Sequence, residues 1–266
     1  MVSKKKLGIL IPVRLESKRL RGKHIQSFYD ITPLQILINN LSRIKNLKKN
    51  NIVVCSPNNK NNDKLKYYIK KIKCNFYQGS ENNIIDRFYK CNKKFKFDII
   101  AEVDGDDILT DPEIINNCIL ELNKSSSDIV FTKGLPIGLN CKVFNAKSLN
   151  YIHSIVGSKN NENGFMQYFY RSKKIKKKII KYKSSINNLR FTLDYQSDIE
   201  FIKNIYIFCS LLKLKMNIKN YMHLLKKFSF LKKINNQNNN LWNKNNKNMK
   251  RLKMIENKKI IIFKVG

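Results

Sequence analysis

Hydrophobic positions along this chain follow two periods that alternate from one segment to the next. Short runs rich in β-branched residues predict strands, and longer stretches with apolar residues three or four positions apart predict helices. The predicted strands cover residues 6–13, 51–56, 74–79, 97–106 and 128–133. The predicted helices cover residues 32–46, 63–73, 82–95 and 111–125. This alternation predicts an α/β protein with a Rossmann-like, mostly parallel central sheet flanked by helices.

Capping signals support two of these helices. In Thr32–Pro33 and in Asp111–Pro112, a capping side chain stands directly before a proline that fits the first helical turn. Farther along, residues 138–152 indicate a strand and a helix, and residues 188–208 indicate a strand, an acidic turn and a long helix. The second half of the chain therefore continues the same architecture.

The composition of the chain changes near residue 232. Residues 1–231 carry the strand and helix pattern, and we expect them to form one domain. Residues 232–266 are rich in asparagine and lysine and have little periodicity, which predicts a linker and a C-terminal extension. The apolar run at 258–265 could add an edge strand to this chain or to a partner.

The net charge is +34 over 266 residues, a value that ordinarily favours nucleic acid or an anionic membrane as a partner. Lysine, asparagine and isoleucine are, however, frequent in every part of the chain, in predicted helices and loops alike. This distribution favours a solvated, lysine-covered surface. We therefore expect nucleic acid not to be the main partner.

The cysteines and the first residues bear on the location of the protein. None of the six cysteines forms a CxxC pair or has a histidine at zinc-ligand spacing, so we expect small apolar side chains in a reducing, cytoplasmic compartment. Residues 1–13 combine a basic start with an apolar run, but the run is short and lacks a small-residue cleavage site. No segment has the roughly 18 uninterrupted apolar residues of a membrane-spanning helix, and we expect no membrane insertion.

Arginine is scarce in this chain, yet three of its eight arginines fall within residues 14–23, directly after the first predicted strand. Arginine binds oxyanions through a planar pair of donors that lysine lacks, so this clustering favours a polyphosphate site over a merely solvated loop. The groups that suit such a site are Arg14, Ser17, Arg19, the flexible backbone of Gly22, and Lys23. The segment is neither a Walker A loop nor a GxGxxG turn.

A second concentration of charge lies in residues 101–113, which contain six of the 19 acidic residues. On strand geometry Asp104 and Asp106 project to the same side, and Gly105 would let a ligand approach between them. Carboxylates at a strand end beside a polyphosphate site suggest Mg²⁺. The last two acidic residues of the segment are better explained as caps of the next helix.

Other candidates carry weaker signals. Asp194 stands at the end of an apolar run, where its carboxylate could reach the same ligand site as residues 101–113. An aspartate at such a position is, however, often only a helix cap. Gly79 and Ser80 lie in a predicted turn, and Asp86–Arg87 follow on a helix, where such a pair is more often structural than catalytic. The three histidines have no triad-like context, and we expect a passive surface role for His24.

Five segments together resemble a known family. The stretch "IPVRLESKRLRGKHI" resembles the R-x-x-S-x-R-L-P-x-K signature of the CMP-sugar synthetases, or acylneuraminate cytidylyltransferases, with Arg21 in place of proline. Four later stretches resemble landmarks of the branch that includes spore-coat polysaccharide cytidylyltransferases: "GSENNIIDRFYKC", "VDGDDILTDPEII", "GLNCKVFNAKSL" and "LRFTLDYQSDIEFI". The resemblance covers residues 6–205. The chain departs from the pattern of this branch at two further places. Ile108 stands where the acidic motif usually has proline, and "ENGFMQYFYR" lacks the His-Val-Thr-Pro run that the branch often has there.

The resemblance implies a nucleotide-diphospho-sugar transferase fold that binds CTP and Mg²⁺, commonly as a homodimer. The residues expected to bind CTP are Arg14, Ser17, Arg19, Gly22, Lys23, Gly79 and Ser80. Asp106 and Asp194 are expected to hold the metal, and Lys23, Arg14 and Asp194 are the expected catalytic residues.

We therefore expect a Mg²⁺-dependent cytidylyltransferase for surface polysaccharide synthesis. It would transfer CMP from CTP to a sugar hydroxyl, with an acidic α-keto sugar as the expected acceptor, and release pyrophosphate. Asp194 or a metal-bound water could be the general base. The alternatives are a CDP-forming enzyme with a phosphorylated acceptor, and a non-catalytic, basic nucleic-acid-binding protein. The sequence does not name the acceptor, and Lys133, Gln167 and Tyr168 are weak candidates to contact it.

Overall fold

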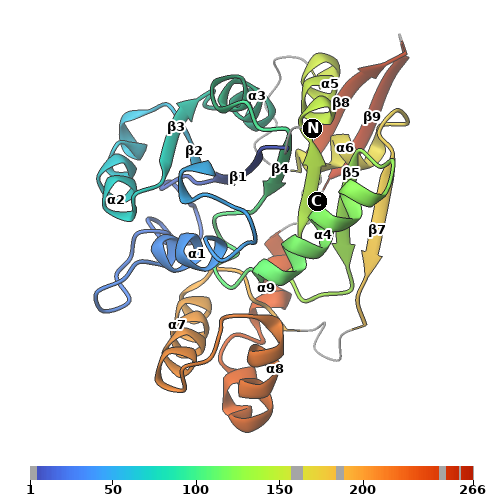
Figure 1. Ribbon diagram of the computed structural model, residues 1–266. Helices are drawn as coiled ribbons and strands as arrows, with labels where there is room; N and C mark the ends of the chain where they lie inside the picture. The colour runs from blue at the N-terminus through green and yellow to red at the C-terminus, as the bar shows by residue number, and fades with distance from the viewer. Residues whose placement is uncertain (1–4, 157–163, 184–188, 246–249, 258, 266) are drawn as a thin grey trace.

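The computed structural model describes residues 5–156, 164–183, 189–245, 250–257 and 259–265 (Figure 1). Its main sheet has seven strands in the order β3-β2-β1-β4-β6-β5-β7. The strands are β1 (Leu7–Pro12), β2 (Ile52–Pro57), β3 (Asn75–Gly79), β4 (Ile99–Glu102), β5 (Ile129–Lys133), β6 (Lys142–Asn145) and β7 (Lys177–Lys181). Only β6 runs against its neighbours, and all other pairings in this sheet are parallel. The predicted α/β class with a mostly parallel sheet is confirmed.

Helices cover both faces of this sheet. They are α1 (Pro33–Leu41), α2 (Lys64–Ile72), α3 (Ile84–Phe95), α4 (Pro112–Lys124), α5 (Ala146–Val156), α6 (Met166–Arg171), α7 (Gln196–Leu211), α8 (Ile218–Lys227) and α9 (Asn238–Asn245). Short 3₁₀ turns lie at η1 (Lys49–Asn51), η2 (Lys60–Asn62) and η3 (Ser229–Lys233). Thr32 and Asp111 cap α1 and α4 as predicted, by accepting hydrogen bonds from the first-turn amides of Gln35 and Glu113.

Alternation along the strands divides the core into two clusters. Ile9 and Ile11 of β1 pack with α1, α4, α7 and α8 on one face, whereas Leu10 packs with α3, α5 and α6 on the other. These three side chains are fully buried. A strand that is apolar on both faces is typical of a sheet covered on both sides.

The order of the strands places a crevice beside β1. The chain runs from β1 outward to β2 and β3, and then returns to add β4 on the opposite side of β1. In open α/β sheets, ligands bind beyond the carboxyl ends of the strands where the order reverses in this way. The segments that follow β1 and β4 are residues 13–32 and 103–111, which contain the two clusters of charge singled out from the sequence.

The segment "LRFTL" was expected to be a strand, but it forms only one isolated bridge, between Arg190 and Ile137. Phe191 and Leu193 are nevertheless fully buried, so the segment contributes to the core without joining the sheet. Its apolar alternation therefore reflects packing, and the turn that follows it leads into α7 as predicted.

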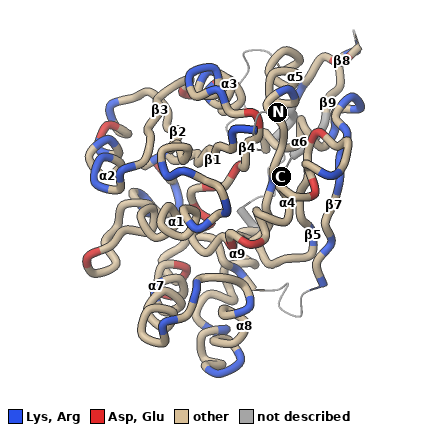
Figure 2. The backbone as a smooth tube through the Cα atoms, in the orientation of Figure 1, with Lys and Arg blue, Asp and Glu red and all other residues tan. Residues whose placement is uncertain are grey.

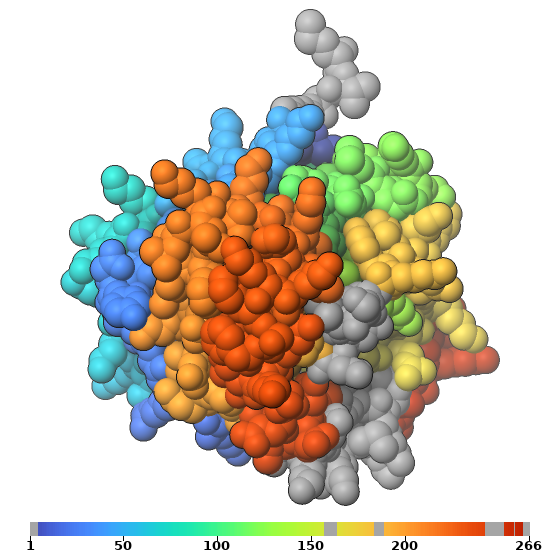
Figure 3. Space-filling model, turned by 90° about the horizontal axis from the view of Figure 1, so that it is seen from below, coloured from blue at the N-terminus to red at the C-terminus, as the bar shows by residue number. Residues whose placement is uncertain are grey.

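The residues after 231 were expected to be a linker and an extension, and the described part of them includes α9. Asn235 and Asn238 are buried, and their side-chain amides donate hydrogen bonds to Asp198 Oδ1 at 2.9 and 2.8 Å. Asn235 also donates to the carbonyl of Arg190 at 3.0 Å. Seen from below, α7, α8 and the segment up to α9 form one continuous face (Figure 3). The domain boundary at residue 231 stays a prediction.

The last described residues form a hairpin of β8 (Lys250–Glu256) and β9 (Lys259–Val265). For the closing run, an edge strand in this chain or in a partner was the possibility that the sequence offered; it forms a strand of this chain, paired antiparallel with β8 in a separate two-stranded sheet. Glu256 anchors this hairpin, because its buried carboxylate accepts hydrogen bonds from Ser172 Oγ, from the Lys173 amide at 3.0 Å and from Tyr151 Oη at 3.0 Å.

Lysine and arginine are distributed over α2, α3, α8 and β7 and over the loops between them (Figure 2). This wide distribution agrees with the expectation that the charge reflects composition more than one binding face. Across the described residues, we find no helix with the length and apolarity needed to cross a membrane.

We predict that Asn235→Ala lowers the free energy of unfolding by about 1–3 kcal/mol, because it leaves the buried carbonyl of Arg190 without this donor and removes one of the two asparagine hydrogen bonds to Asp198 Oδ1. Urea denaturation followed by circular dichroism would measure this loss. Asn236 is exposed, so the matched control Asn236→Ala should stay within about 0.5 kcal/mol of the parent. Equal, small effects of both variants would mean that the segment after residue 231 is not an integral part of the domain.

Candidate functional site

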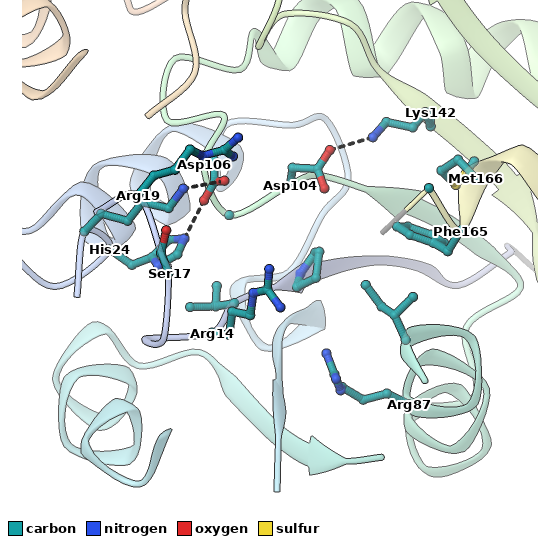
Figure 4. Close-up of a pocket in the computed structure, with 16 residues that line it drawn as sticks. Arg14, Ser17, Arg19, His24, Arg87, Asp104, Asp106, Lys142, Phe165 and Met166 are labelled. Carbon is teal, nitrogen blue, oxygen red and sulfur yellow. Dashed lines mark hydrogen bonds and ion pairs between the residues drawn. The ribbon is translucent and has the colours of Figure 1, made fainter. Parts of the chain in front are cut away.

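A cavity opens at the carboxyl ends of β1 and β4, at the point where the strand order reverses. Its walls come from the loop after β1, the turn after β4, the start of β6, the start of α3 and the region around α6 (Figure 4). The charged side chains that line it are Arg14, Arg19, Lys23, His24, Arg87, Asp104, Asp106 and Lys142. The topology therefore brings together both charge clusters that the sequence showed separately.

The loop after β1 has a defined shape. The Leu15 amide donates to Asn62 Oδ1 at 2.9 Å, and the Leu15 carbonyl accepts from the Gly22 amide at 2.9 Å, which closes the loop into a ring. Gly22 has a φ of 66°, a conformation that other residues rarely adopt. Within the ring, Ser17 Oγ accepts from the Leu20 amide at 3.3 Å. The arginines of the loop thus extend from a fixed backbone.

Lys23 lies at the centre of the site. Its ammonium nitrogen is 2.6 Å from Asp106 Oδ2, 2.7 Å from the Leu193 carbonyl oxygen and 3.1 Å from Asp194 Oδ1. The lysine is only 3% exposed. Three oxygens from two distant segments therefore converge on one buried cation, and we call this group, Asp106 Oδ2, Asp194 Oδ1 and the Leu193 carbonyl, the oxygen cage.

Asp194 is held by further cations. Its Oδ1 accepts from Arg19 Nη2 at 2.6 Å, and its Oδ2 accepts from Arg190, which is fully buried. Asp198 fixes the same turn, because its Oδ2 accepts from the amides of Asp194 and Tyr195, each at 2.9 Å. The orientation of the Asp194 carboxylate is thus determined by both the loop after β1 and the start of α7.

His24 contradicts the expected passive surface role. It is only 2% exposed, and its Nε2 lies 2.7 Å from Asp106 Oδ1. Burial alone would raise the pKa of Asp106, but the adjacent Lys23 ammonium and the hydrogen bond with His24 hold that pKa well below its usual range. Asp106 is therefore an anion at neutral pH. The sequence signal for His24 was its position directly after Lys23.

Asp104 and Asp106 do not point to the same side, as strand geometry had suggested. The strand β4 ends at Glu102, and the chain turns through Gly105, so the alternation of a strand does not apply. Asp106 faces Lys23, whereas Asp104 Oδ2 lies 2.8 Å from Lys142 Nζ on the other side of the cavity (Figure 4).

Gly105 was expected to let a ligand approach; it lines the cavity, and it also makes room for neighbouring atoms of the protein. A Cβ at this position would lie 2.7 Å from the Pro12 carbonyl oxygen and 2.7 Å from Val13 Cγ2. Glycine therefore allows the ends of β1 and β4 to come together, and this close approach sets the position of Asp106 opposite Lys23.

The far wall of the cavity contains a second charged group. Lys142 Nζ bridges Asp104 and the fully buried Glu102 carboxylate, which is 2.6 Å away. Burial and the charge of Asp104 raise the pKa of Glu102 to about 8, although Lys142 opposes this rise. The sequence did not single out Lys142, because its partners lie far away in the chain: Glu102 ends β4, 40 residues earlier, and Asp104 follows that strand.

Of the predicted residues from β3 to α3, only Arg87 is among the described residues that line the cavity. Gly79 ends β3 and Ser80 follows it, and neither is among the described residues that line the cavity. The Ser80 carbonyl instead accepts from Arg87 Nε at 2.9 Å, and Arg87 itself lines the cavity. Asp86 does not pair with Arg87 through its carboxylate but with Lys90 and His153.

The weak candidates for contacts with an acceptor do not reach the cavity. Tyr168 is 1% exposed and is not among the described residues that line the cavity. Lys133 and Gln167 are absent from the described residues that line the cavity, where Phe165 and Met166 of the same region are present.

The oxygen cage has the donor chemistry of a Mg²⁺ site, since Mg²⁺ prefers oxygen ligands and commonly takes one or two carboxylates from the protein. The described residues contain no cluster of three or more histidine, cysteine, aspartate or glutamate side chains that could hold a metal ion by itself. Asp106 and Asp194 therefore fit the ion only together with oxygens from another source, such as phosphates.

Two known proteins are similar to this chain in sequence. A relative in Methanocaldococcus jannaschii, an uncharacterized protein, is 32% identical over 140 residues, which cover 53% of this chain and 57% of that protein. The spore coat polysaccharide biosynthesis protein SpsF of Bacillus subtilis is 25% identical over 203 residues, which cover 74% of this chain and 85% of SpsF.

Solved structures share the fold. A cytidylyltransferase from Leptospira borgpetersenii serovar Hardjo-bovis superimposes with a TM-score of 0.74 at 24% identity, covering 86% of this chain and 97% of that one. A CMP:2-keto-3-deoxy-manno-octonic acid synthetase complexed with CTP superimposes with a TM-score of 0.59 at 11% identity, covering 76% and 98%. Residues 8–247 match the sequence profile of the cytidylyltransferase family, so the family predicted from the five segments is confirmed, and this chain belongs to the cytidylyltransferases.

Proposed function

We propose that the protein transfers CMP from CTP to a hydroxyl group of a sugar acceptor and releases pyrophosphate. The observation that carries this proposal is the meeting of an arginine-rich loop with two anionic carboxylates at the reversal point of the sheet. A triphosphate matches the loop, and a divalent cation matches the carboxylates. Membership in the cytidylyltransferase family supports CTP as the nucleotide.

The loop after β1 would bind the triphosphate. Arg14, directly before the closed ring, and Arg19, within it, both line the cavity, and Ser17 adds a hydroxyl donor near Arg19 (Figure 4). In transfer to the α-phosphate, negative charge increases on the phosphate oxygens and on the leaving pyrophosphate. Cationic side chains that are already positioned at those oxygens stabilise the transition state, because they do not have to reorganise during the reaction.

Asp106 and Asp194 would hold Mg²⁺ together with phosphate oxygens. The ion, when bound, neutralises phosphate charge and orients the nucleotide for in-line attack. Asp194 is the residue we propose as general base if the acceptor hydroxyl needs one. It is not among the described residues that line the cavity, but its Oδ1 accepts hydrogen bonds from Arg19 and Lys23, which do line it. Arg190 and Asp198 would keep this carboxylate oriented.

The acceptor would occupy the far side of the cavity, opposite the loop. Asp104 and Lys142 offer an acceptor and a donor of hydrogen bonds there, and Phe165 and Met166 offer an apolar surface. Such a mixed wall suits a sugar, which has polar edges and apolar ring faces. An acidic α-keto sugar remains our proposed class, and Arg14 or Arg87 could pair with its carboxylate. A homodimer remains our proposed assembly.

A phosphorylated acceptor, with a CDP-linked product, is the second candidate. The arginines of the cavity would bind a second phosphate as readily as a carboxylate, and this observation keeps the candidate open. The two candidates differ in product, because attack by a hydroxyl gives a CMP ester and attack by a phosphate gives a CDP ester.

We predict that the purified protein with Mg²⁺ releases pyrophosphate from CTP, and from none of the other three nucleoside triphosphates at a comparable rate. The assay should use a panel of α-keto acid sugars and sugar phosphates, and mass spectrometry of the product should separate CMP from CDP esters. Mg²⁺-dependent binding of CTP without turnover would mean that the acceptor is missing from the panel. Failure to bind any nucleotide would contradict the proposed function.

A second prediction concerns the metal carboxylates. Asp106→Asn removes the negative charge but keeps the size of the side chain, so turnover with CTP should fall by roughly 100-fold because the cation loses an anionic ligand. Asp30 is exposed, and Asp30→Asn should leave the rate unchanged. Circular dichroism would confirm that both variants fold. Full activity of Asp106→Asn would contradict the assignment of the metal site.

A further inference from the structure

The protein contains its own substitute for the divalent cation. We propose that the Lys23 ammonium occupies the oxygen cage in the nucleotide-free protein, and that Lys23 turns to the phosphates when a nucleotide binds. The cage would then accept a divalent cation only together with a nucleotide. This inference rests on the proposed function of the site, and it concerns the order and coupling of binding.

The first support is the geometry of the cage. The Lys23 ammonium nitrogen has three oxygens around it, at 2.6, 2.7 and 3.1 Å. A cation-binding site in a protein likewise surrounds its ion with oxygens. Only 4% of the Lys23 side chain is exposed, so water does not take part to any large extent. A metal ion cannot share this position with the ammonium, because both need the same carboxylate oxygens and carry charge of the same sign.

The second support is that all four carboxylate oxygens of Asp106 and Asp194 already have partners. Asp106 Oδ1 is 2.7 Å from His24 Nε2, and its Oδ2 faces Lys23. Asp194 Oδ1 accepts from Arg19 and from Lys23, and its Oδ2 accepts from Arg190. An isolated divalent cation would have to displace Lys23 and leave a buried ammonium without a counter-charge, which is strongly unfavourable.

The third support is that a nucleotide supplies the missing counter-charge. Lys23 lines the same cavity as Arg14 and Arg19, so a bound triphosphate would offer it phosphate oxygens close to its present position. The lysine side chain has a flexible four-carbon stem, which allows this turn without movement of the backbone. Arg190 is unsuited to such a turn, because it is fully buried behind Asp194.

This exchange couples the two ligands in a fixed direction. The nucleotide removes the ammonium from the cage, and this raises the affinity of the cage for the cation. By thermodynamic reciprocity, the cation must raise the affinity for the nucleotide by the same factor. The enzyme would therefore bind neither ion nor triphosphate tightly alone.

The test uses Mn²⁺ as the probe, because its free aqueous ion has an electron paramagnetic resonance signal that is lost on binding. We expect the wild-type chain without nucleotide to bind Mn²⁺ weakly, and Lys23→Met to bind it about tenfold more tightly because the cage is then vacant. Arg14→Met is the matched control, since it removes a cation from the same cavity but leaves Lys23 in the cage. Its affinity for Mn²⁺ should stay close to that of the wild type.

Stability gives a second readout if Lys23→Met folds poorly in metal-free buffer, because its two carboxylates then repel each other. Mn²⁺ should raise the melting temperature of Lys23→Met and leave that of the wild type and of Arg14→Met nearly unchanged. The double variant Lys23→Met/Asp106→Asn should lose both the tight binding of Mn²⁺ and the stabilisation by it.

Calorimetry tests the coupling itself. In the wild type, CTP with Mn²⁺ should bind about tenfold more tightly than CTP in EDTA, and Asp106→Asn should lose most of this difference. The inference is overturned if the wild type binds Mn²⁺ alone as tightly as Lys23→Met, or if Lys23→Met binds no Mn²⁺ at all. Failure of the wild type to bind CTP in either buffer would instead overturn the proposed function, and the results with Mn²⁺ alone would still decide whether Lys23 fills a cation site.

Discussion

The contact of the Lys23 ammonium with Asp106 and Asp194 is the interaction on which the site depends. It joins three segments that are far apart in the sequence: the loop after β1, the turn after β4 and the residues before α7. A buried carboxylate or a buried ammonium would be costly to hold without a partner of opposite charge. Together they offset each other's charge, so the fold can keep three ionised groups at one place for later use by a ligand.

Residues outside the cavity support this contact. Arg190 and Asp198 orient Asp194, and Asp198 is in turn satisfied by Asn235 and Asn238. The side chains that contact the ligand site are thus held by hydrogen bonds from residues behind them. Such a site keeps its geometry during binding, because its side chains cannot rotate independently. The extent of the family match, to residue 247, agrees with a functional unit that includes these asparagines.

The large positive charge of the chain contributes to this site only through a few residues. The chain has 53 lysines and arginines, and those in the described residues occur in helices, strands and loops throughout the fold, many of them exposed (Figure 2). Lys23 and Lys142 differ from them, because both are largely buried against carboxylates at the cavity. The position of a cationic side chain, more than the number of such side chains, therefore determines whether it belongs to the site. In the sequence, the few arginines were a better guide to the cavity than the many lysines.

The sequence by itself determined the α/β class, the two capped helices and the family, because each depends on short-range periodicity or on short motifs with fixed spacing. It also brought Arg14, Arg19, Lys23 and Asp106 to attention. Only the tertiary structure decided that His24 is buried against Asp106, that Lys142 faces Asp104, and that Asn235 supports Asp198. The reason is that each of these contacts joins residues 37 or more positions apart, and such a pairing depends on how distant segments pack together, about which local periodicity carries no information.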